Sequence, residues 1–110
     1  MNQALKLLSD RKEPDYRNSI KESISAIEAL VRKIAGEKGK FLNLLNSLEK
    51  KIELHPALKE AFNKLYGYTS DKGGIRHSLL EKSEITFEDA KFMLVTCSAF
   101  ANYVVSIINK

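Results

Sequence analysis

The residues best suited to chemistry lie in one short stretch, Asp71–His77, which reads DKGGIRH. The adjacent glycines Gly73 and Gly74 let backbone amides approach a ligand closely, because neither residue carries a Cβ atom. Arg76 places a permanent cation beside His77, whose side chain titrates near neutral pH. Such a pair can cleave RNA, since the histidine helps to move the 2′-hydroxyl proton and the guanidinium stabilises the charge that develops on the phosphorane.

The same stretch also has a purely structural interpretation. In that case the glycines shape a connection, Arg76 pairs with a carboxylate such as Glu22 or Glu28, and His77 caps a helix. Short motifs often match by chance, so the residue types alone favour the structural interpretation.

Under the catalytic hypothesis, Arg76 stabilises phosphate, His77 acts as the acid and base, and Asp71 or Glu22 orients them. The candidate substrate-binding residues are Arg17, Asn18, Lys72, Gly73, Gly74 and Tyr68. Two of these assignments have a simpler alternative. Asn18 and Glu22 suit the solvated face of a helix, and Tyr68 suits half-buried packing as well as stacking on a base.

Composition limits the other classes of function. The chain has 110 residues, 44% of them hydrophobic and 29% charged, which predicts one soluble globular domain. A net charge of +4 permits a polyanionic partner without requiring one. Two histidines without cysteines or carboxylates at ligand spacing predict no metal site, and no phosphate-binding glycine loop of a known nucleotide-binding type is present. We expect no cofactor and a cytoplasmic location.

The longest apolar element is predicted over Thr86–Asn109, where Thr86 and Asp89 form a capping box. Apolar residues at helical spacing cover more than half of its circumference, so neighbouring helices or a second subunit must wrap it. A homodimer is therefore expected. Polar residues interrupt the apolar run, which favours a core helix over a membrane span. The one cysteine, Cys97, belongs to the apolar positions and is expected to be a buried small residue.

Helical periodicity continues through the rest of the chain, and no strand alternation appears. Further helices are predicted over Met1–Ser9, Pro14–Ala35, Lys40–Leu54 and Pro56–Tyr66. His55 is expected to cap the helix that Pro56 opens. Gly67–Gly74 is predicted as a loop and Ile75–Lys82 as a short helix or packed turn. The fold class is therefore all-α, a compact bundle of four to five helices with a long apolar C-terminal helix.

Four blocks of residues resemble a known family. They are Asp15–Ala29 (DYRNSIKESISAIEA), Leu65–Asp71 (LYGYTSD), Gly74–His77 (GIRH) and Ala99–Tyr103 (AFANY). Together they look like the C-terminal domain of bacterial abortive-infection (AbiJ-like) proteins, which resembles the HEPN superfamily of helical bundles. The resemblance extends from about Leu5 to the end of the chain.

This resemblance implies a phage-defence module, with a separate N-terminal domain fused before it. HEPN members often dimerise and often act as metal-independent ribonucleases, whose arginine and histidine are separated by four to six residues at a dimer interface. Here Arg76 and His77 are adjacent. The domain is then either a variant endoribonuclease or RNA-binding module, or a non-catalytic fold used for dimerisation, interaction or ligand sensing.

Overall fold

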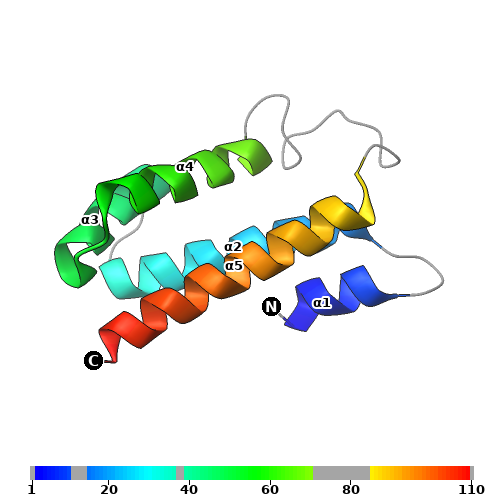
Figure 1. Ribbon diagram of the computed structural model, residues 1–110, viewed down its shortest axis with the longest axis horizontal. Coiled ribbons are helices and arrows are strands. Elements are labelled where there is room, and N and C mark those ends of the chain that lie inside the picture. The colour runs from blue at the N-terminus through cyan, green and yellow to red at the C-terminus, as the bar shows by residue number, and fades with distance from the viewer. Residues whose placement is uncertain (1, 11–14, 37–38, 71–84, 110) are drawn as a thin grey trace.

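A computed structural model describes residues 2–10, 15–36, 39–70 and 85–109, and these residues form five α-helices and no strand (Figure 1). The helices are α1 (Asn2–Ser9), α2 (Tyr16–Ala35), α3 (Phe41–Ile52), α4 (Pro56–Ser70) and α5 (Phe87–Ile108). The predicted all-α bundle with a long apolar C-terminal helix is confirmed. The expected element at Ile75–Lys82 lies outside the described residues.

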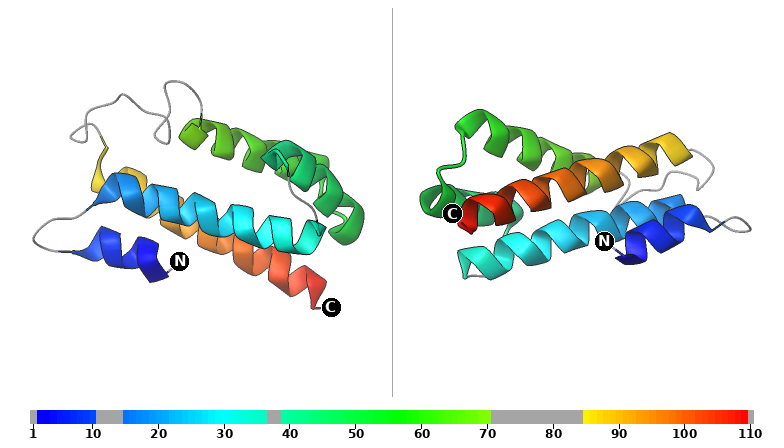
Figure 2. Two further views of the ribbon diagram at one scale, coloured as in Figure 1. Left: turned by 180° about the vertical axis from the view of Figure 1, so that it is seen from behind. Right: turned by 60° about the horizontal axis from the view of Figure 1, so that its bottom comes forward.

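The centre of the bundle is the pair α2 and α5, which run side by side in the same direction (Figures 1 and 2). Each helix contributes one apolar stripe to the interface, as the 3.6-residue period requires. The buried residues of these stripes are Ile20, Ile24, Ile27 and Val31 on α2, and Ala90, Met93, Cys97, Phe100 and Val104 on α5. The helices α3 and α4 cover one side of this pair, and α1 packs against α2 and α5.

The ends of α2 show how local sequence sets its length. Asp15 is the N-cap, and its carboxylate accepts a 3.1 Å hydrogen bond from the backbone N–H of Asn18. The helix therefore begins after Asp15, whereas we expected Pro14 and Asp15 in its first turn. Gly36 ends the helix in the left-handed region with φ 72°, which glycine adopts without steric cost. The Nζ atom of Lys51 donates a 2.9 Å bond to the carbonyl of Ile34 in the last turn.

The start of α4 confirms the role expected of His55. Its Nδ1 atom accepts a 3.0 Å hydrogen bond from the backbone N–H of Ala57, and its carbonyl accepts from the N–H of Lys59. Pro56 occupies the first helical position, where a missing N–H leaves no bond unmade.

The end of α4 corrects one expectation. The helix continues to Ser70, so the predicted loop at Gly67–Gly74 is wrong for its first four residues. A glycine inside a helix costs only about 1 kcal/mol. Once α4 is packed through Phe62 and Tyr66, each further residue adds a backbone hydrogen bond, and Gly67 alone does not end the helix.

The start of α5 confirms the predicted capping box. The Oγ1 atom of Thr86 accepts a 3.2 Å bond from the N–H of Asp89, and the Asp89 carboxylate accepts a 3.0 Å bond from the N–H of Thr86.

At the other end of the chain, α1 is held by a buried polar contact. The Ser19 hydroxyl donates a 2.7 Å bond to the carbonyl of Ala4.

Candidate functional site

The predicted catalytic centre falls largely outside the described residues. Arg76, His77 and Asp71 lie there, together with the proposed substrate-binding residues Lys72, Gly73 and Gly74. The structure therefore describes the helix ends that flank this segment, and it describes Glu22, Arg17, Asn18 and Tyr68.

The starts of α2 and α5 are in contact at one end of the bundle. Tyr16 at the start of α2 contacts Phe87 at the start of α5, with ring centroids 6.1 Å apart in an edge-to-face arrangement. Tyr68 near the end of α4 lies within electrostatic range of Asp89 in the first turn of α5. Partial burial, followed by the negative charge of Asp89, raises the pKa of the Tyr68 hydroxyl. The starts of α2 and α5 thus share one end of the bundle, and Tyr68 of α4 lies within electrostatic range of it.

The predicted site residues on α2 lie at this same end. The Asn18 side chain donates a 2.7 Å bond to the Asp15 carboxylate, so its amide belongs to the helix cap. Arg17 is half-buried, and Glu22 is exposed to solvent a turn further along. These contacts place Asn18 in a structural role at the N-terminus of α2.

Under the structural interpretation of Asp71–His77, Arg76 pairs with a carboxylate such as Glu28. In the described part of the chain, the Glu28 carboxylate lies 3.5 Å from the Tyr66 hydroxyl and 3.9 Å from the Arg32 guanidinium. Tyr66 also stacks on Phe41 at 4.5 Å between centroids, which makes Tyr66 a packing residue between α3 and α4.

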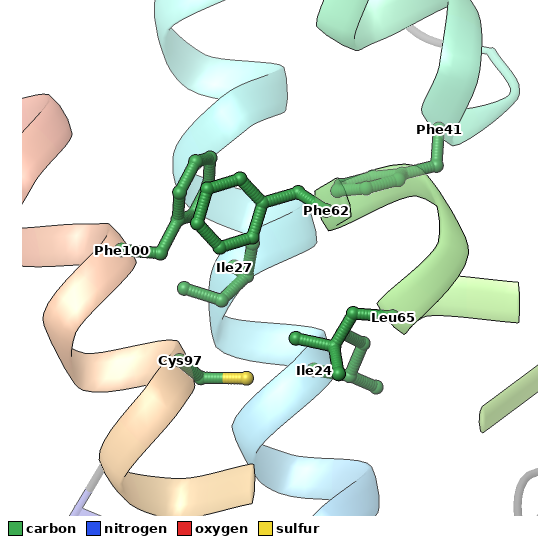
Figure 3. A pocket seen from close by; sticks show the side chains of 7 residues that line it. All are labelled: Ile24, Ile27, Phe41, Phe62, Leu65, Cys97 and Phe100. Carbon is green, nitrogen blue, oxygen red and sulfur yellow. The ribbon is translucent and has the colours of Figure 1, made fainter. Parts of the chain in front are cut away.

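A small cavity lies inside the core, between α2, α3, α4 and α5 (Figure 3). Its volume is about 10 Å³, barely enough for one water molecule. Its lining consists of Ile24, Ile27, Phe41, Phe62, Leu65, Cys97 and Phe100. A cavity this small and this apolar is a packing defect and not a ligand site.

Cys97 extends from α5 toward the residues of α2 and α4 that line this cavity (Figure 3). Its side chain is 2% exposed. Burial raises the pKa of the thiol to about 12, because the thiolate loses its hydration. The expectation that Cys97 is a buried small residue is confirmed.

The side of α5 that faces away from α2 carries a feature that the sequence reasoning missed. Phe92, Val95, Ala99 and Tyr103 recur at helical spacing, and we call them the outward stripe. Phe92 is 59% exposed, Val95 57% and Tyr103 41%. Ala99 is exposed between them. The spacing i, i+3, i+7, i+11 was a readable signal, but it overlaps the inward apolar residues, so only the packing separates the two stripes.

An open groove of about 320 Å³ runs beside the outward stripe, between α4 and α5. We call it the α4–α5 groove. Its lining residues are Leu58, Phe62, Thr96, Ala99, Phe100 and Tyr103. Phe62 of α4 meets Phe100 of α5 at 3.7 Å between ring centroids, and this contact joins the two helices at the groove. Apart from Thr96 and the Tyr103 hydroxyl, the lining side chains are apolar.

Two further properties bear on the class of protein. Among the described residues, no group of three His, Cys, Asp or Glu side chains is placed to hold a metal ion. By length and composition alone, α5 is apolar enough to cross a membrane, a test that core helices of soluble proteins also pass. No family model, curated protein or solved structure matches this chain.

Proposed function

We propose that this chain is a helical module of a bacterial phage-defence protein and that it works by docking another polypeptide on its α4–α5 face. The defence assignment rests on the residue blocks that resemble abortive-infection proteins. The docking assignment rests on one observation, the exposed outward stripe beside the apolar α4–α5 groove.

Docking is favoured because it removes exposed apolar surface from water. Each Å² of apolar surface removed from water contributes roughly 25 cal/mol. Contiguous exposed apolar patches on soluble proteins commonly mark interaction sites. Phe92, Val95 and Tyr103 lie along one helix face, and Tyr103 also lines the groove, so a partner that covers them gains this free energy.

A matched pair of variants tests this function. Val95 and Val105 are both exposed on α5, at 57% and 42%, but only Val95 belongs to the outward stripe. We expect Val95→Lys to abolish phage protection in a plaque assay on cells that express the protein. Val105→Lys should retain that protection. Both variants must keep the wild-type circular dichroism spectrum and melting temperature. Equal protection by both variants would overturn the docking proposal.

A second candidate function is metal-independent RNA cleavage at Arg76 and His77. The observation that favours it is the contact of Tyr16 with Phe87, which joins the starts of α2 and α5, together with Arg17 and Asn18 in the first turn of α2 and Tyr68 of α4 within electrostatic range of Asp89. In this proposal the 2′-oxygen attacks the adjacent phosphorus and the 5′-oxygen leaves. His77 accepts the 2′-hydroxyl proton, and Arg76 stabilises the negative charge of the phosphorane. The leaving 5′-oxygen takes a proton from water, and the products are a 2′,3′-cyclic phosphate and a 5′-hydroxyl.

Cleavage of a labelled RNA in EDTA tests this second function. Wild type should cleave, and His77→Ala and Arg76→Ala should lose at least roughly 100-fold in rate, as removal of an acid–base or charge-stabilising group does. A Lys91→Ala variant on α5 controls for a nonspecific loss of positive charge. No cleavage by wild type, or equal cleavage by all variants, would count against a nuclease and leave docking as the function.

A further inference from the structure

We infer that α1 is a detachable clasp, which leaves its seat on α2 and α5 as one unit while the other four helices stay folded. The structure shows the closed state. In the open state α1 stays tethered to α2 through the chain between Ser9 and Tyr16. The clasp lies on the side of the α2–α5 pair opposite to α3 and α4, so the inference is independent of docking on the α4–α5 face (Figures 1 and 2).

Few apolar side chains hold α1 on its seat. Its buried residues are Ala4 and Leu8, one turn apart, whereas Leu7 is half-buried and Leu5 is 54% exposed. In the described part of the chain, Leu8 is the one residue of α1 in the hydrophobic core cluster. By comparison, α3 has 12 residues against the eight of α1 and buries five apolar side chains. Detachment of α1 therefore removes one large side chain from the core.

Hydrogen bonds also join α1 to α2. The Ser19 hydroxyl donates a 2.7 Å bond to the Ala4 carbonyl, and the Asp15 N–H donates a 3.0 Å bond to the Leu7 carbonyl. In the open state all four groups reach solvent, so water replaces each lost partner. Opening therefore leaves none of these donors and acceptors buried without a bond.

The seat on α2 itself contains hydroxyl groups. Ser19 and Ser23, one turn apart on the same face, are the buried polar side chains of the residues that the structure describes. The Ser23 hydroxyl donates a 3.0 Å bond to the Ser19 carbonyl within α2. A surface that carries hydroxyl groups loses less free energy in contact with water than a wholly apolar one does. The seat of α1 thus tolerates exposure better than the apolar α2–α5 interface.

The shortness of α1 makes its detachment and its unfolding one event. Isolated helices of fewer than about 12 residues are marginal in water, and α1 has eight. Its first turn carries no acidic side chain that would stabilise the positive end of the helix. Once α1 leaves the seat it loses its helix, and the conformational entropy that it regains favours the open state.

The other helices keep their own core in the open state. Farther along α2, Ile27 and Val31 stay buried in the cluster shared with α3 and α5, and the contact of Phe62 with Phe100 joins α4 to α5. Opening therefore uncovers the face of α2 around Ser19 without dissolving the bundle. A molecule that binds only this uncovered face shifts the population toward the open state, which makes the clasp a means of regulation.

Hydrogen exchange of the full chain, followed residue by residue by NMR, tests the clasp. The backbone amides in the last turn of α1, from Lys6 to Ser9, should share one protection factor, at least roughly tenfold below that of the buried parts of α2 and α5. Protection that falls gradually along α1 would indicate fraying from one end. Protection equal to that of α2 would show that α1 opens only when the whole chain unfolds. Either result would overturn the inference.

A matched pair of leucines tests what holds the clasp closed. Leu8→Ala removes the buried side chain and should speed exchange of the α1 amides at least roughly tenfold, with α3 and α4 unchanged. Leu5→Ala, at an exposed position of the same helix, should change those rates by less than roughly threefold. Ser19→Ala is the milder second variant and should also act on the α1 amides selectively. Equal acceleration in all five helices would place α1 in the cooperative core and contradict a clasp.

Discussion

The two sides of α5 differ in environment far more than in composition. The inward side carries Met93, Cys97 and Phe100, all at most 2% exposed against α2 and α4. The outward side carries Phe92, Val95 and Tyr103, all more than 40% exposed. Both sides are apolar and both follow the helical period. Apolar periodicity therefore identifies the helix faces that need to be covered, but it does not determine whether the same chain covers them.

The largest expected contrast between the two sides is thiol reactivity. Burial raises the pKa of Cys97 to about 12, so at pH 8 its thiolate fraction is roughly a thousandfold below that of an ordinary exposed cysteine. We expect folded wild type to react with a thiol-specific disulfide reagent at least that much more slowly than a Val95→Cys, Cys97→Ala double variant. Stopped-flow absorbance measures both rates in dilute, monomeric protein. Comparable rates would show that the inward side of α5 opens readily.

The same pKa predicts a stability difference at high pH. The Cys97 thiol stays protonated in the folded state. Its contribution to the free energy of unfolding is therefore complete below pH 9.0, the ordinary pKa of the thiol, and is lost as the pH rises toward about 12. Urea unfolding at pH 8 and pH 10 should show wild type losing about 1 kcal/mol more than Cys97→Ala. A parallel decline of the two proteins would contradict a buried, neutral thiol.

Two phenylalanines on opposite sides of α5 should differ strongly in their contribution to stability. Phe100 is 2% exposed and meets Phe62, so Phe100→Ala should lower the free energy of unfolding by about 3–5 kcal/mol through lost burial and the cavity it leaves. Phe92 is 59% exposed, and Phe92→Ala should change the free energy of unfolding of the monomer by less than about 0.5 kcal/mol. Urea denaturation at low protein concentration measures both. Similar losses would mean that Phe92 is covered within one chain.

A further prediction concerns the buried hydrogen bond that joins α1 to α2. Ser19→Ala removes the donor to the buried Ala4 carbonyl and should cost about 1–3 kcal/mol. Ser23→Ala is the matched control, because the Ser23 hydroxyl donates to the Ser19 carbonyl within one helix. Both carbonyls lie inside helices, but only the Ser19 hydroxyl bond joins α1 to α2, so the control should cost less. Equal losses would indicate that Ala4 and α1 contribute little to the fold.

Local sequence was sufficient wherever neighbouring residues decide the outcome. The caps at Thr86 and His55, the stop at Gly36 and the apolar face of α2 were all predictable, because each depends on residues within a turn or two. The burial of Cys97 was predictable from its place in the apolar register of the last helix. Where a local rule was weak, as at Gly67, the prediction of a loop was wrong, since packing of α4 outweighs a cost of about 1 kcal/mol.

The candidate docking face was decided by tertiary structure. Periodicity places Phe92 and Phe100 on one apolar helix, but only the position of α2 makes Phe100 inward and Phe92 outward. The α4–α5 groove depends in the same way on Phe62 and Leu58, which lie more than thirty residues before their α5 neighbours. The sequence by itself determined the helices and their caps, because those depend on contacts between neighbours along the chain. Which apolar surface is buried depends on contacts between distant segments, and a local pattern does not contain them.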